Sequence, residues 1–226
     1  MQKTAPKRTS PEKTLSENSS CSAGGRSRGR PRAFDRDDAL SAAMQLFWRK
    51  GYSATSIADL TAAMGIGSPS LYAAFGSKEA LYAEALEFYI AAHEGVVWKG
   101  FAEADTARDA IKRLLFDSAA GLSETPNGCM VTLSAVGGEG NAELGARVLA
   151  ARSHGLEQIE ARITRGQTAG EIPAAVGVHI LARFVQCVQN GMSILARDGA
   201  THAELSGVAE TAMLGWDERV GLARNV

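Results

Sequence analysis

Three arginines, Arg28, Arg30 and Arg32, alternate with glycine and proline near the start of the chain and could carry positive charge into a groove of DNA. Residues 1–34 hold 8 Lys and Arg against 2 Asp and Glu, whereas residues 35–226 hold 16 against 23. An extended arm can insert arginines into a narrow A/T-rich minor groove, whose negative potential attracts them. The alternative is a solubilising tail that contacts DNA diffusely, and the sequence leaves both interpretations open.

Two short helical patterns meet at a glycine between residues 55 and 78. The apolar residues of the first pattern recur at i, i+3 and i+7, and Thr55 or Ser56 can cap its start. Gly65 supplies the permissive backbone for the turn, and Pro69 stands in the first turn of the second helix, where a missing N–H is tolerated. This is the layout of a helix-turn-helix, which places its second helix in the DNA major groove.

The second helix of this motif would present small side chains to DNA. If Leu71 and Phe75 pack inward, helical geometry turns the opposite side toward the groove. The residues at the helix start and on that outer side are Gly67, Ser68, Pro69, Ser70, Tyr72 and Ala73. Such side chains favour contacts with thymine methyl groups over extensive hydrogen bonding to bases.

The elements that must position these residues are all expected to be helices. Residues 1–33 have almost nothing to bury and predict a disordered basic arm, and residues 34–77 predict a three-helix domain. Ser77 can cap a long helix that begins at about residue 78. From there onward, no convincing period-two alternation indicates a strand. The further helices are expected at roughly 106–123, 128–137, 141–168, 174–198 and 202–219.

Composition limits the class of protein. The chain has 226 residues, of which 45% are hydrophobic and 22% charged, as is ordinary for a globular protein. No apolar run reaches the roughly 20 residues of a membrane span and no signal peptide is recognisable, so we expect a cytoplasmic protein. The cysteines, Cys21, Cys129 and Cys187, are odd in number and lack a C-x-x-C spacing, which argues against a disulfide framework or structural zinc.

The sequence contains fragments of two enzyme motifs, but neither motif is complete. His93-Glu94 begins like the zinc-protease motif H-E-x-x-H, but Val97 occupies the position of the second histidine. Gly138 and Gly140 begin a dinucleotide-binding pattern that lacks its third glycine. No G-x-S-x-G elbow or phosphate-binding P-loop is present, and we therefore expect that the chain is not an enzyme.

The segments 30–32, 52–55 and 70–81 resemble the TetR/AcrR family of bacterial transcriptional regulators. The resemblance spans residues 30 to about 82. It implies an all-helical homodimer, in which residues 34–77 bind DNA and residues 78–226 bind an effector and dimerise. Most members are repressors that a small molecule releases from a palindromic operator, so the protein would lie on the bacterial nucleoid when bound.

The resemblance also implies phosphate contacts from Thr55 or Ser56, Tyr72 and Lys78 through hydroxyl, phenol and ammonium groups. Two of these side chains have plainer interpretations. Tyr72 can pack on the next helix, and Lys78 can be a solvated charge. Ser68 departs from the commonest family pattern, in which Lys or Arg often stands.

Two apolar stripes in the last helices suggest a dimer interface, which by resemblance is a four-helix bundle. The alternative is that both stripes close the core of one subunit. The stripes consist of Ile180, Phe184, Cys187, Val188, Gly191 and Leu195, then Leu205, Val208, Ala209, Ala212, Met213 and Trp216.

Candidate walls of an effector pocket come from the middle helices, although most such residues are ordinary core. Polar side chains such as His154 and Gln186 could orient a small-molecule effector. The candidate pocket residues are Leu115, Phe116, Ala119, Cys129, Met130, Leu133, Ser134, Leu156, Ile159, Phe184, Cys187 and Val188.

Residues 127–130 and 189–193 look like the ComR-like subgroup of the family, which includes a copper-responsive regulator. Cys129 follows a Pro-Asn-Gly turn at an expected helix start, which favours the thiolate and suits a sensor of electrophiles or oxidants. A soft Cu(I) site could also be assembled, although buried Cys and Met usually fill apolar space. Its members would be Cys129, Met130, His154, Cys187 and Met192. A thiol- or copper-responsive repressor and an architectural DNA-binding protein thus remain alternatives to a ligand-released repressor.

Overall fold

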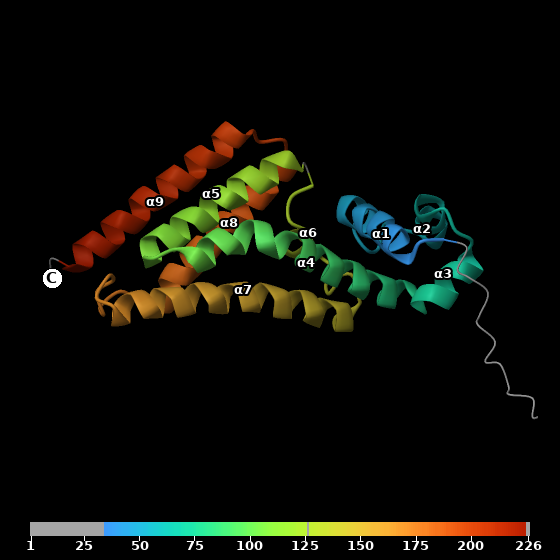
Figure 1. Cartoon of the computed structure of the whole chain (residues 1–226), viewed down its shortest axis with the longest axis horizontal. Coiled ribbons are helices and arrows are strands. Elements are labelled where there is room, and N and C mark those ends of the chain that lie inside the picture. Colours follow the sequence, from blue (N-terminus) through green and yellow to red (C-terminus); the bar gives the residue numbers. More distant parts are fainter. Residues whose placement is uncertain (1–33, 126, 225–226) are drawn as a thin grey trace, which may run out of the picture. The chain divides into compact units, whose positions relative to one another are not determined.

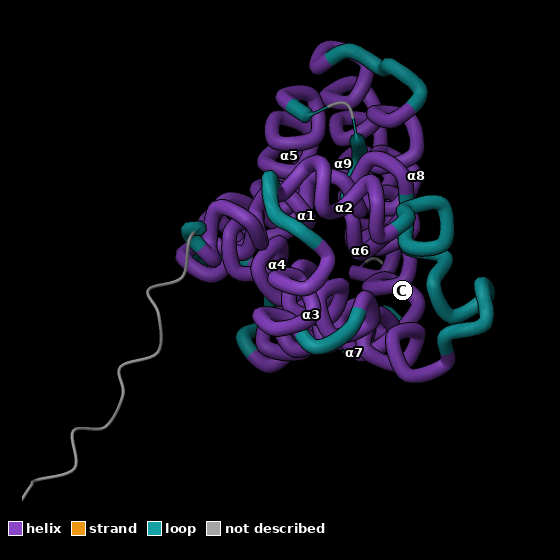
Figure 2. Tube along the Cα trace, turned by 90° about the vertical axis from the view of Figure 1, so that its right-hand side faces the viewer, coloured by secondary structure: helices purple, strands orange, loops and turns teal. Residues whose placement is uncertain are grey.

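The computed structural model describes residues 34–125 and 127–224, and every regular element in this part of the chain is an α-helix (Figure 1). Figure 2 shows the same helices joined by loops. The expected all-α fold class is confirmed. The nine helices described are α1 (Arg36–Lys50), α2 (Ile57–Met64), α3 (Ser68–Phe75), α4 (Lys78–Glu103), α5 (Ala107–Glu124), α6 (Met130–Leu133), α7 (Ala142–Thr168), α8 (Val178–Arg197) and α9 (His202–Arg224).

Local capping sets the ends of the helices around the helix-turn-helix. Ser56 and Asp59 form a capping box at the start of α2, because each side chain accepts a backbone N–H of the other residue. Gly65 ends α2 in the left-handed region, with φ 65°. Pro69 stands in the first turn of α3, and Ser77 caps α4 by accepting the N–H of Ala80. These ends agree with the sequence-based expectation.

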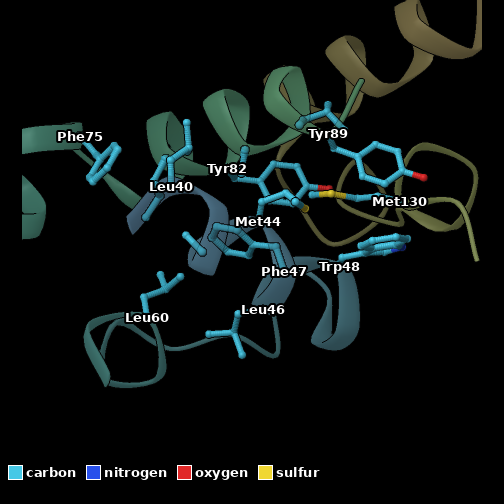
Figure 3. Packing of buried hydrophobic residues seen from close by; sticks show 14 of the residues in the cluster. Leu40, Met44, Leu46, Phe47, Trp48, Leu60, Phe75, Tyr82, Tyr89 and Met130 are labelled. Atoms are coloured by element: carbon cyan, nitrogen blue, oxygen red, sulfur yellow. The ribbon is translucent and has the colours of Figure 1, made fainter. Parts of the chain in front are cut away.

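The core beneath α2 and α3 extends beyond the helix-turn-helix. Leu60 and Leu71 are fully buried in it, and the ring of Phe47 meets the ring of Tyr82 edge-on at 5.0 Å between centroids. Tyr82 belongs to α4, and Met130 from α6 packs into the same cluster (Figure 3). This core therefore crosses the expected domain boundary after residue 77, and residues from Phe34 onward form one compact unit.

A second core lies among the longer helices. Ile111 and Leu114 of α5, Ile163 of α7 and Trp216 of α9 are at most 2% exposed within it. The buried guanidinium of Arg162 donates to the carbonyls of Ala104 and Asp105, which directly follow α4, at 3.3 and 2.8 Å. This arrangement satisfies carbonyls that have no partner within the helix.

One expected helix is much shorter than its pattern suggested. Instead of residues 128–137, only Met130–Leu133 is helical. Gly128 precedes it with φ 66°, and Gly140 follows in the turn with φ 96°. Glycine tolerates these left-handed conformations, so the backbone leaves the helix on both sides of α6.

The basic arm predicted at residues 1–33, with Arg28, Arg30 and Arg32, lies outside the described residues. Within the described ranges, no helix combines the length and apolar character needed to cross a membrane.

Candidate nucleic-acid interface and effector cavity

The outer face of α3 is exposed, as its sequence pattern predicts. Leu71 and Phe75 are 0% and 4% exposed and anchor the helix, whereas Tyr72 is 46% exposed. The remaining exposed positions on or next to this helix are Gly67, Ser68, Pro69, Ser70 and Ala73. The structure thus presents a narrow helical ridge of small side chains with one aromatic ring beside it.

Thr55 does not share this exposed surface, although we expected a phosphate contact from Thr55 or Ser56. Thr55 is fully buried, and its hydroxyl donates to the carbonyl of Gly51 at 2.6 Å. A buried hydroxyl with an internal acceptor ties the end of α1 to the start of α2 instead of facing a ligand. Ser56 is exposed, so it is the residue of this pair that can reach a phosphate.

Lys78 is held against an aromatic ring at the start of α4. Its Nζ lies 4.2 Å from the centroid of the Tyr52 ring, and partial burial lowers the pKa of Lys78. The Tyr52 hydroxyl donates to Oε1 of Glu79 at 2.6 Å, and burial together with this carboxylate raises the pKa of Tyr52 to about 12. Lys78 is therefore a positioned cation and not a freely moving one.

A contact that the sequence did not predict joins this region to the turn after α6. Both the backbone N–H and the hydroxyl of Ser53 donate to Oε2 of Glu139, at 3.3 and 2.8 Å. The two residues are 86 positions apart, and no local pattern connects them. The contact ties the loop before α2 to the segment that follows α6.

A cavity of about 470 Å³ opens between α4, α5, α7 and α8, and the segment from Gly128 to Thr132 forms part of its wall. Its apolar wall includes Val97 and Trp98 of α4 and Leu122 of α5. Cavities of this size and mixed lining are typical of sites for small organic molecules.

Hydrogen bonds fix much of the polar wall. The amide of Gln189 donates to the hydroxyl of Ser118 at 2.9 Å, and the backbone N–H of Cys129 donates to the hydroxyl of Ser193 at 2.7 Å. Arg152 also lines the cavity. The wall is therefore pre-formed on the α5 and α8 sides.

The cavity lies next to a direct link with α1. Nε1 of Trp48 donates to the carbonyl of Gly128 at 2.8 Å, in a buried position. The Trp48 ring packs edge-on against Tyr89 and His93, with centroids 4.9 and 5.4 Å away, and both of these rings line the cavity. Figure 3 shows Trp48 and Tyr89 near Met130. A molecule in the cavity would thus touch residues that hold α1.

Comparisons with known proteins agree with this arrangement. A family model described as "Bacterial regulatory proteins, tetR family" matches residues 39–85. The HTH-type transcriptional repressor ComR of Escherichia coli (strain K12) is 39% identical over 208 residues, which cover 86% of this chain and 95% of ComR. The chain belongs to the tetR family of bacterial regulatory proteins.

Two further relatives support this assignment. The repressor BdcR of Escherichia coli (strain K12) is 52% identical over 62 residues, which cover 27% of this chain and 32% of BdcR. A solved structure of a cysteine mutant of the TetR family regulator CifR, complexed with 26 bp operator DNA, is 39% identical with a TM-score of 0.77. That match covers 82% of this chain and 98% of the CifR chain. These relatives are regulators and not enzymes.

Within the family fold, the cavity has a different lining from the one predicted from sequence. Of the residues named from the sequence, Cys129 and Ile159 line it, and so do His154 and Gln186. Eight expected residues lie wholly or partly buried away from its wall, and Phe184 and Cys187 are exposed on α8. The eight are Leu115, Phe116, Ala119, Met130, Leu133, Ser134, Leu156 and Val188. The side of α5 that faces the cavity instead carries Ser118, Gly121, Leu122 and Thr125.

The residues suggested for a Cu(I) site do not all meet at the cavity. Cys129 and His154 line it, but Met130 is buried in the first core, Met192 is buried beside α5 and Cys187 is exposed. In the part of the chain that the structure describes, no three His, Cys, Asp or Glu side chains are grouped for metal binding.

The two apolar stripes of the last helices have different environments. The α9 residues Leu205, Ala209 and Trp216 are buried within the subunit. In contrast, Ile180 and Phe184 of α8 are 73% and 39% exposed. Leu195 of α8 and Leu214 of α9 are exposed as well, so α8 carries several exposed apolar side chains and α9 carries one.

We expect Trp48→Phe to lower the free energy of unfolding by about 1–3 kcal/mol, because the buried carbonyl of Gly128 would lose its donor. The measurement is chemical denaturation at fixed protein concentration, since association also contributes to stability. Trp98→Phe is the matched control, because the same ring is replaced at a partly buried position where the indole N–H has no described acceptor. Equal losses in the two variants would contradict a specific role for the Trp48 hydrogen bond.

Proposed function

We propose that the protein is a homodimeric transcriptional repressor that binds a palindromic operator through α3 and leaves it when a small molecule occupies the cavity. The observation that carries this proposal is the Trp48–Gly128 hydrogen bond, which connects α1 of the DNA-binding region to the cavity wall. Its relatives ComR and BdcR are named repressors, and the CifR structure contains operator DNA. Residues 34–77 are the DNA-binding region, residues 78–226 bind the effector and dimerise, and the protein acts in the cytoplasm.

DNA contacts are proposed to come from the exposed side of α3 and the adjacent helix starts. Tyr72 and Ser56 contact phosphates, and the N-terminus of α4 offers backbone donors near Lys78. Because the bases meet mainly small side chains, the arginines of residues 1–33 supply additional contacts in the minor groove. The base-facing residues are Gly67, Ser68, Pro69, Ser70 and Ala73.

The dimer is proposed to form through the exposed apolar surface of α8 and α9. Two copies of α3 must lie about 34–36 Å apart to enter successive major grooves on one side of DNA. An effector that binds better to a conformation with another spacing shifts the population away from DNA, whereas equal affinity for both conformations would shift nothing. The cavity wall at Gly128 is the place where this preference would act on α1.

Footprinting of the full-length protein on the intergenic DNA beside its own gene tests the proposal. We expect a protected palindrome, lost when an effector is added. An architectural DNA-binding protein would instead bind with strong salt dependence and without a discrete protected site. Absence of any protection on promoter fragments would contradict DNA-binding repression altogether.

The position of Cys129 favours a second candidate function, in which a thiol reaction causes release. Cys129 lines the cavity. Burial raises the pKa of Tyr89 well above its ordinary range, and the adjacent Cys129 adds to this rise. The neighbouring phenol would thus remain protonated and able to donate to the sulfur. Modification of Cys129 would add volume to the cavity wall beside the Trp48 link.

We expect N-ethylmaleimide to release the parent protein from operator DNA and to leave Cys129→Ser bound. Cys187→Ser is the control, because Cys187 is exposed on α8 and does not line the cavity. Fluorescence anisotropy of labelled operator DNA measures the release. If Cys129→Ser and the parent respond equally, the thiol candidate is wrong.

A further inference from the structure

We infer that the cavity binds an organic carboxylic acid with an aromatic or branched apolar body, and that Arg152 receives its carboxylate. This inference rests on the proposed function, because it names the chemical class of the effector for the same cavity. It rests on the position of Arg152, on the charge of the cavity lining and on the shape of the apolar wall.

Arg152 is oriented by carbonyl groups and not by a carboxylate. Its Nε donates to the carbonyl of Val131 at 3.0 Å, and one terminal nitrogen donates to the carbonyls of Thr132 and Ser134, both at 2.8 Å. The other terminal nitrogen makes no hydrogen bond with any residue that the structure describes, and no described Asp or Glu forms an ion pair with Arg152. Two N–H donors of this half-buried side chain therefore have no described acceptor, on a residue that lines the cavity.

The cavity lining carries a positive charge with no negative charge among its described residues, although three carbonyls accept hydrogen bonds from Arg152. Among the lining side chains that the structure describes, none is Asp, Glu or Lys, and Arg152 is the permanent cation. A charge partly withdrawn from water is costly unless an opposite charge or hydrogen bonds compensate it. A ligand carboxylate would supply the missing opposite charge and would accept charge-assisted hydrogen bonds from the second terminal nitrogen. An amine of the same shape would meet a like charge.

The apolar wall indicates what the rest of the ligand is. The ring of Trp98, on α4, lies close to α7 at Gly155. A Cβ atom at Gly155 would be only 3.4 Å from Cζ2 of the Trp98 ring. Val97, Leu122 and Ile159 extend this wall on three helices. With a cavity volume of about 470 Å³, the space suits an aromatic or branched body of drug-like size and exceeds what a bare metal ion or acetate would fill.

The same arginine is connected to the segment that holds Trp48. The carbonyls that accept from Arg152 belong to Val131, Thr132 and Ser134, three to six residues beyond Gly128. A ligand carboxylate that binds the Arg152 guanidinium would compete with these carbonyls for its hydrogen bonds. Binding of the acid would thus act on the α6 segment and, through it, on the Gly128 carbonyl.

The test compares acids with neutral and cationic molecules of matched shape. Isothermal titration calorimetry of the full-length protein would use phenylacetate, phenylacetamide and phenethylamine, followed by naphthylacetate and naphthylacetamide. We expect at least one acid to bind about tenfold or more tightly than its amide, and the amine to bind most weakly. In Arg152→Gln the preference for the acid should disappear while affinity for the amide stays the same.

Arg165→Gln is the matched control, because Arg165 lies on the same helix, is exposed and does not line the cavity. It should bind the acids like the parent. If Arg152→Gln does not fold, Arg152→Lys keeps the charge and should retain a reduced preference for the acid. Three results would each overturn the inference. The amides or the amine could bind as tightly as the acids, no acid could bind at about 10 mM, or the Arg152 variant could keep the preference of the parent for the acid.

Operator binding by the ligand-free parent is measured alongside. Intact operator binding without acid binding would reject the ligand class and leave the proposed function standing. Acid binding without operator binding would reject the repressor function and leave the Arg152 site standing.

Discussion

Ala73→Glu should weaken operator binding by the full-length protein about 100-fold or more, because each half-site would lose roughly 1–3 kcal/mol. Ala73 is exposed on α3, on the side away from the buried Leu71 and Phe75. A carboxylate at this position would face phosphate oxygens and base acceptors within the major groove. The carboxylate would repel the phosphate oxygens and could not donate a hydrogen bond to the base acceptors. A homodimer would contain the substitution in both subunits.

The measurement is a titration of labelled operator DNA at fixed salt concentration, since salt alone changes such affinities by orders of magnitude. Ala161→Glu is the control, because it places the same side chain on an exposed position of α7. The free energy of unfolding of both variants should lie within about 0.5 kcal/mol of that of the parent, as is usual for substitutions at exposed positions. Operator affinity of Ala73→Glu equal to that of Ala161→Glu would show that α3 does not face DNA.

Phe184→Asp is expected to dissociate the homodimer at micromolar concentration and to reduce operator affinity by more than about 100-fold. Phe184 is 39% exposed on α8, and its ring tip lies 3.8 Å from where a Cβ of Gly215 on α9 would stand. Ile180 and Leu214 on the two helices are 73% and 70% exposed. A carboxylate at the centre of an apolar interface would be buried without a partner, which is strongly unfavourable.

Sedimentation velocity measures the change in oligomeric state, and operator titration measures its functional effect. Leu149→Asp serves as control, because Leu149 is 63% exposed on α7, outside the α8 and α9 surface. The control should remain dimeric and bind operator normally. A dimer that persists in Phe184→Asp, or a monomeric parent, would contradict the proposed interface.

The helices of this protein were predictable because their signals are local. The capping box of Ser56 and Asp59 spans three residues, and the left-handed Gly65 ends α2 where the apolar pattern ends. The exposed face of α3 was likewise predictable, because Leu71 and Phe75 are one helical turn apart and only one side of a short helix can be buried. Neighbours along the chain provide all the information for these features.

Local sequence does not determine the environment of a side chain that suits two different positions. Thr55 and Ser56 look equally suited to a helix start, but Thr55 is buried against Gly51. The stripe of α9 and the stripe of α8 have similar periodicity, yet the first is buried and much of the second is exposed. Which face of an amphipathic helix meets which neighbour depends on packing among several helices.

The cavity required contacts between distant parts of the chain. Trp48 and Gly128 are 80 residues apart. Arg152 donates to carbonyls 18 to 21 residues earlier, on a segment that the sequence had suggested was helical as far as residue 137. Local sequence was sufficient for the helices, their caps and the surface of α3, because each depends on interactions within a few residues. Tertiary packing determined the lining of the cavity, the free donors of Arg152 and the link to α1, because hydrogen bonds between distant segments form only when the helices are packed together.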